Sequence, residues 1–205
     1  MTVLFVCSVI MVATAVERWW CYWRDGNQEV KLWKIVKRYM LAKDMKMATQ
    51  ETKKSHSMLS RALMEVFEAI SDRQTGWEES VDDLWHLRRD ESMEALRRRL
   101  VIFGTLSFIT PLIGLMGSVL GIHHAFYDIA LTGNGGANVV ASGISEALLS
   151  TLVGVIVAVP ALILYNGFSA ALASRVSQWD RVGQELFMII GAWRRSPVDL
   201  EKKTK

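Results

Sequence analysis

One acid and two hydroxyls are the residues best suited to chemistry in the most apolar part of the chain. Between Leu100 and Ser174 only Asp128 and Glu146 are charged, and there is no Lys or Arg. An ionisable group inside a membrane costs about 2.5–3.5 kcal/mol, so Glu146 is expected to face protein or water. It either lines a water-filled pathway or packs against a neighbouring helix. Ser118 and Thr151 lie deeper in their segments, and either line the same pathway or bond to helix backbone.

Two long apolar segments hold these residues. Residues 100–126 and 139–167 are each long enough to cross a hydrocarbon core of about 30 Å as a helix. The loop between them, residues 127–138, is rich in glycine and favours an antiparallel hairpin. Residues 1–20 form a shorter apolar segment that ends in Trp19 and Trp20, as is typical of a membrane interface.

The positive charges predict the orientation. All 24 Lys and Arg lie in residues 18–99 and 175–205. The positive-inside rule therefore places a helical domain (21–99) and a C-terminal helix and tail (168–205) in the cytoplasm, with loop 127–138 in the periplasm. Three spans then put the N-terminus outside. Apolar residues at helical spacing over 58–70, 81–85 and 172–193 complete the prediction of an all-α integral membrane protein.

Small residues at three-, four- and seven-residue spacing predict where the last two spans pack. Such residues let helices approach closely in lipid, and a chain of three spans with two such faces is expected to oligomerise. Pro111 and Pro160 are expected to bend these spans. The predicted packing residues are Gly114, Gly117, Gly121, Gly143, Ala147, Gly154 and Ala158.

Several function classes do not fit the sequence. Cys7 and Cys21 are too few for a disulfide framework and have no ligand spacing, so we predict no metal and no cofactor. The net charge of +3 is mild, and nucleic acid is not an expected partner. No nucleophile stands beside a base, so an enzyme is not expected. A solute transporter is disfavoured because the chain has no internal symmetry.

The motifs around the site residues resemble the ExbB/TolQ/MotA proton-channel family, in particular its ExbB/TolQ branch. The pattern P-x-x-G-L-x-G-T-V-x-G-I is matched from Pro111 to Ile122. The pattern G-I-x-E-A-L-x-x-T-x-x-G-x-x-x-A-x-P is matched from Gly143 to Pro160. On this resemblance, Glu146 and Thr151 match residues of the family's proton pathway, and Ser118 takes the place of a Thr.

The resemblance implies a multi-pass protein of the bacterial inner membrane, assembled as a homopentamer in membrane lipid. It would surround an ExbD/TolR-like single-span partner whose intramembrane Asp carries the proton, and a TonB-like or TolA-like protein would complete the system. The implied function is a channel subunit that couples the proton motive force to work on periplasmic or outer-membrane partners. A gliding or flagellar-type motility stator and a non-conducting scaffold remain alternatives. A MotA-like stator would have four spans, so three spans favour ExbB/TolQ.

Overall fold

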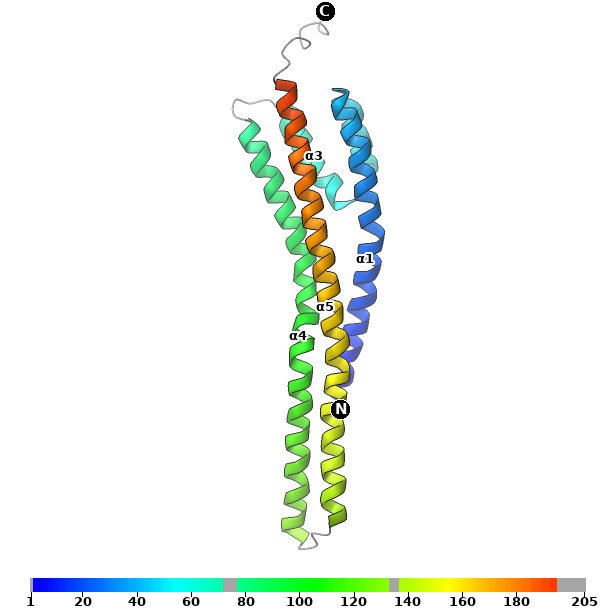
Figure 1. Cartoon of the computed structure of the whole chain (residues 1–205), viewed down its shortest axis with the longest axis vertical. Helices are drawn as coiled ribbons and strands as arrows, with labels where there is room; N and C mark the ends of the chain where they lie inside the picture. The colour runs from blue at the N-terminus through cyan, green and yellow to red at the C-terminus, as the bar shows by residue number, and fades with distance from the viewer. Residues whose placement is uncertain (1, 72–76, 133–136, 195–205) are drawn as a thin grey trace, which may run out of the picture. The chain divides into compact units, whose positions relative to one another are not determined.

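The described part of the chain is entirely helical between its turns. The computed structural model describes residues 2–71, 77–132 and 137–194. These residues form five α-helices: α1 (Thr2–Leu41), α2 (Met45–Lys54), α3 (Met58–Ser71), α4 (Trp77–Thr132) and α5 (Ala137–Arg194) (Figure 1). The predicted all-α class is confirmed for this part of the chain.

Three of the helices are long and apolar enough to cross a membrane. The candidate stretches are Thr2–Trp20 in α1, Val81–Leu131 in α4 and Val140–Trp193 in α5. A membrane protein with three such helices is what the charge distribution predicts. Helix α4 continues to Thr132 and α5 begins at Ala137, so helix extends into both ends of the predicted loop 127–138. Residues 127–132 contain neither Gly nor Pro, which explains why α4 continues through them.

The chain divides into two compact units, and α1, α4 and α5 contribute to both. The first, which we call the apolar unit, contains Met1–Trp19 and Arg97–Ala170. The second, the charged unit, contains Trp20–Leu96 and Ala171–Lys205. In the apolar unit the rings of Phe103 and Phe168 pack with centroids 5.6 Å apart.

The charged unit is built around a core of apolar side chains from all five helices. Helix α3 buries one face, which includes Leu63, Val66 and Phe67. The indoles of Trp85 on α4 and Trp179 on α5 are 1% exposed, and their ring centroids lie 5.8 Å apart. Burying two aromatic side chains of this size is a large part of what joins α4 to α5 in this unit.

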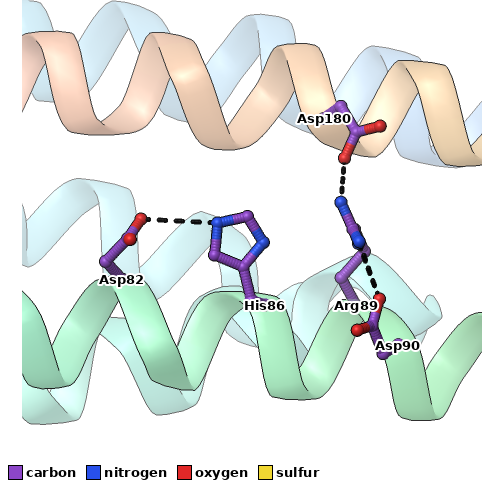
Figure 2. Close-up of polar contacts among 5 residues, drawn as sticks. All are labelled: Asp82, His86, Arg89, Asp90 and Asp180. Carbon is purple, nitrogen blue, oxygen red and sulfur yellow. Dashed lines mark hydrogen bonds and ion pairs between the residues drawn. The ribbon is translucent and has the colours of Figure 1, made fainter.

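Polar contacts also connect α5 to its neighbours in the charged unit. The Trp33 indole on α1 donates to the Glu185 carboxylate at 2.6 Å, and Lys37 Nζ lies 3.2 Å from the same group. The Trp33 N–H, with help from Lys37, holds the pKa of Glu185 below its usual value. On the other side of α5, Arg89 of α4 forms an ion pair with Asp180 (Figure 2).

Candidate functional site

The site lies in the apolar unit, where α4 and α5 approach each other closely. A Cβ atom placed on Gly154 would lie 2.7 Å from the carbonyl oxygen of Thr110 and 3.1 Å from Gly114 Cα. Real Cβ atoms are essentially never closer than 3.0 Å to another heavy atom, so this crossing requires glycine. The absence of side chains here brings the two backbones into direct contact.

The same contact continues toward the C-terminal end of α4 and the N-terminal end of α5. A Cβ on Gly121 would lie 3.0 Å from Ala147 Cβ, and one on Gly143 would lie 2.4 Å from Ala125 Cβ. The structure therefore places most of the predicted packing residues along one α4–α5 contact: Gly114, Gly117, Gly121, Gly143, Ala147 and Gly154. Ala158, the seventh, is 6% exposed on α5. Both α4 and α5 remain helical through Pro111 and Pro160.

This close approach brings Ser118 and Thr151 together. Their hydroxyl oxygens are 2.6 Å apart, and Ser118 Oγ is also 2.6 Å from the carbonyl oxygen of Ala147. Ser118 is buried and Thr151 is half-buried. Two oxygens at 2.6 Å need a proton between them, and the Ala147 carbonyl has none to donate. The Ser118 proton must therefore point at Ala147, and Thr151 must donate to Ser118.

These bonds fix the polarity of the pair. Once the Thr151 proton is directed at Ser118, only lone pairs of Thr151 Oγ1 are left for a further partner. Thr151 thus presents a hydrogen-bond acceptor at the partly exposed edge of the helix pair. A water molecule or a protonated carboxylic acid is the type of donor that such an oxygen receives.

Glu146 lies on a different face of α5, away from the hydroxyl pair. It is exposed and lines a groove of about 600 Å³ together with Ser142 and Ser150. The α4 side of this groove contributes His124 and Asp128. The structure thus brings Glu146 beside a second carboxylate and an imidazole, and leaves it separate from Ser118 and Thr151.

The sequence alone does not point to His124 and Asp128 as neighbours of Glu146, although a signal is present. Gly117, Gly121, His124 and Asp128 follow one another at four-, three- and four-residue steps, so they share one face of α4. That face continues the small-residue pattern of the packing surface. Among the described residues, no three His, Cys, Asp or Glu side chains gather as metal ligands would.

Comparisons with known proteins place the chain in a family. A family model described as the MotA/TolQ/ExbB proton channel family matches residues 34–181. The chain is 24% identical over 200 residues to "Biopolymer transport protein ExbB" of Pseudomonas putida, covering 90% of this chain and 60% of that protein. It is 38% identical over 85 residues to the ExbB protein of Salmonella typhimurium, covering 42% of this chain and 35% of that one.

A Tol protein is similar to the same degree. "Tol-Pal system protein TolQ" of Haemophilus influenzae is 37% identical over 84 residues, covering 41% of this chain and 37% of that protein. The chain thus spans between about a third and three fifths of the length of these relatives.

Proposed function

The chain belongs to the MotA/TolQ/ExbB proton channel family, and we propose that it is a proton-channel subunit of an inner-membrane motor of the TonB or Tol type. The names of its relatives describe biopolymer transport and a Tol-Pal system, and neither describes an enzyme. The observation that carries the proposal is the hydroxyl pair, because a buried Ser118 fixes the hydroxyl of Thr151 as an outward acceptor.

In this proposal Thr151 receives a hydrogen bond from a proton carrier that moves past it. The acceptor is pre-oriented, so the carrier does not have to reorganise the site when it arrives. The two spans, residues 100–126 and 139–167, contain one acid, Glu146. Glu146 lines a different face of α5 from Thr151. The carrier is therefore a carboxylic acid from another chain, and an ExbD/TolR-like single-span protein with an intramembrane Asp fits this role.

The proposed assembly is a homopentamer around that partner, with the N-terminus outside and the charged unit in the cytoplasm. Its support is the large apolar surface that the chain leaves uncovered, for example at Phe108 and Ile163, which are 71% and 66% exposed. Lipid, further copies of the chain and a TonB-like or TolA-like protein would share this surface. A close-packed α4–α5 pair is a rigid wall for such a channel.

A non-conducting scaffold is the alternative that the same geometry supports. The hydroxyl of Ser118 bonds to the Ala147 carbonyl, and a bond of this kind can serve helix packing alone. The two functions differ in what happens when Thr151 loses its hydroxyl but keeps its shape.

The test is proton flux in vesicles that contain this chain and its single-span partner, under an imposed membrane potential. Thr151→Val removes the acceptor and keeps the branched shape, and a lost hydrogen bond of about 1.4 kcal/mol in the barrier lowers the flux about tenfold. Ser118→Ala should lower it less, because Thr151 keeps its oxygen. Thr105→Val is the matched control, since Thr105 is exposed on the same α4 segment. Wild-type flux in a fully assembled Thr151→Val complex would show that protons do not pass by Thr151, and the hydroxyl pair would then serve helix packing alone, as in the scaffold.

A second comparison tests the acid. Glu146→Gln should lower the flux, because the groove beside it then loses an ionisable group, whereas Glu94→Gln on the exposed surface of α4 should not. Equal flux in both variants would remove Glu146 from the proposed pathway.

A further inference from the structure

The charged unit carries two surfaces of opposite sign. Residues 30–41 at the end of α1 contain Lys31, Lys34, Lys37 and Arg38 and no acid. Residues 77–87 at the start of α4 contain Glu78, Glu79, Asp82 and Asp83 and no Lys or Arg. Neither charge excess is used by the proposed channel, which lies in the apolar unit.

The basic surface is hollowed. A groove of about 430 Å³ between α1 and α5 is lined by Lys34, Lys37 and Arg181, and the largely buried indoles of Trp33 and Trp179 also reach its wall. The groove also contains Val30, which is 43% exposed, so it offers positive charge beside apolar side-chain surface. It fits an acidic helix face better than a bare anion.

The two carboxylates that also line this groove already have partners. Glu185 accepts the Trp33 N–H and lies beside Lys37, and Glu29 accepts the Trp179 N–H at 3.2 Å. Arg175 lies 3.4 Å from Glu29 as well. Lys34 and Arg181 are exposed, and neither forms an ion pair within the described part of the chain.

The acidic surface is equally short of cations. Figure 2 shows Asp82 beside His86, 3.6 Å away, while Arg89 turns instead to Asp180 and Asp90. Asp82 is half-exposed, Asp83 is exposed, and no Lys or Arg pairs with either among the residues that the structure describes. Arg88, the other nearby arginine, pairs with Glu65 and Glu91.

Both surfaces lie at one level along α5. Lys37 and Trp33 contact Glu185, which places the basic groove there. Trp85 lies against Gly183, and Asp82 precedes Trp85 on α4 by about one turn. Because α4 and α5 run in opposite directions, Asp82 again lies near the level of residue 185. The ion pairs of the two neighbouring helices face different sides of α5, because Asp180, which pairs with Arg89, and Glu185, which pairs with Lys37, are five residues and thus about 140° apart.

We propose that the basic groove of one copy binds the acidic start of α4, around Asp82 and Asp83, of a neighbouring copy in the membrane. This inference rests on the homo-oligomer of the proposed function and names the surface that joins its subunits. Copies in one membrane share a common depth, so surfaces can meet only if they lie at the same level, as these do. Two different surfaces in contact produce a head-to-tail interface, which forms a ring when the rotation from one copy to the next closes on itself.

Lipid is a poorer occupant of the groove. Lys34 lies about 21 Å further along α1 than Trp20, where the apolar stretch Thr2–Trp20 ends. The headgroup region extends only about 5–8 Å beyond the hydrocarbon core on each side. The groove is therefore beyond the reach of a phospholipid phosphate, and a protein segment fits it better.

The test is disulfide formation between two differently tagged copies, each with Cys7 and Cys21 replaced by Ser. One copy carries Lys34→Cys and the other Asp83→Cys, and the oxidant is applied to membranes that contain the whole complex. A disulfide needs Cα atoms about 4.4–6.8 Å apart, so only a close approach yields the cross-linked dimer. The matched control pairs Lys34→Cys with Glu94→Cys, which is exposed on α4 about 16 Å from position 83.

We expect a cross-linked dimer with positions 34 and 83 and none with 34 and 94. The yield should fall when Arg181→Glu is added to the copy that carries Lys34→Cys, since charge complementarity with Asp82 of the other copy is then reduced, and it should fall in concentrated salt. An oligomer of unchanged size without the 34–83 disulfide would overturn the interface and leave the channel function intact. A disulfide in a complex that fails to conduct protons would overturn the channel and leave the interface intact.

Discussion

One methyl group at Gly154 tests whether the close approach of α4 and α5 holds the hydroxyl pair together. A Cβ there would lie 2.7 Å from the carbonyl oxygen of Thr110, whereas ordinary contacts begin at 3.4 Å. The three nearest atoms, on Thr110 and Gly114, all belong to backbone, so no side chain can rotate aside. The helices must separate locally by about 0.7 Å to accept the Gly154→Ala substitution.

Such a separation acts on stability and on the site together. Overpacking of this kind costs about 1–3 kcal/mol, while an alanine in a helix gains up to about 1 kcal/mol over glycine. The Ser118–Thr151 contact, now 2.6 Å, would lengthen to roughly 3.3 Å and lose most of its strength. Gly167→Ala is the control in the same helix, because a Cβ there meets no atom within 4 Å.

We therefore expect Gly154→Ala to be about 1–3 kcal/mol less stable than Gly167→Ala. Reversible unfolding in mixed detergent micelles, followed by circular dichroism, measures this difference. The flux assay should show a loss with Gly154→Ala and none with Gly167→Ala. If the two alanine variants unfold and conduct alike, the glycine contact does not position the hydroxyls.

Three further outcomes follow from the charged unit. Gly183→Ala should destabilise the charged unit by about 1–3 kcal/mol, because the new Cβ would lie 2.3 Å from Trp85 Nε1. A change in tryptophan fluorescence should accompany this loss of stability. An unshifted fluorescence spectrum at wild-type stability would contradict the packing of Trp85 against Gly183. Glu185→Gln should cost stability at neutral pH. The Glu185 pKa is lower in the folded state than its usual 4.5, so its contribution is complete above that value and is lost as the pH falls through the lowered pKa. The gap between wild type and Glu185→Gln should thus close in acid, and a gap that widens there would reverse the sign. Asp44→Ala should cost about 0.5–2 kcal/mol, since the Asp44 side chain accepts the N–H of Met47 at 3.1 Å and caps α2; Asp44→Asn, which keeps the acceptor, should lose much less.

Much of the fold follows from where charges are missing. A stretch from Leu100 to Ser174 without Lys or Arg can only be accommodated as membrane-spanning helix or buried core, and its length favours the first. Gly114 and Gly154 each belong to a pattern of regularly spaced small residues on their own helix. In lipid, such a pattern allows helices to approach closely. Such features are local in sequence, so they can be predicted from it.

The chemistry of the site depends on register, which local patterns do not determine. Ser118 and Thr151 are placed opposite each other only because α4 and α5 cross at Gly114 and Gly154, and a shift of one residue would separate them. The same crossing puts Asp128 into the groove of Glu146. Contacts between side chains so distant in sequence are properties of the packed pair, and only the packed pair shows them.

The hydroxyl pair also explains why this chain would need a partner to move protons. A serine and a threonine are neutral near pH 7, so they can receive and orient a hydrogen bond but cannot store a proton. The Ser118 hydroxyl is already committed to the Ala147 carbonyl, which leaves Thr151 as the one acceptor of the pair. Glu146 can store a proton, but its groove lies on another face of α5. In the proposed channel, a mobile carboxylate that passes Thr151 would therefore belong to another helix, and the glycine contact would keep the acceptor in place while that helix moves.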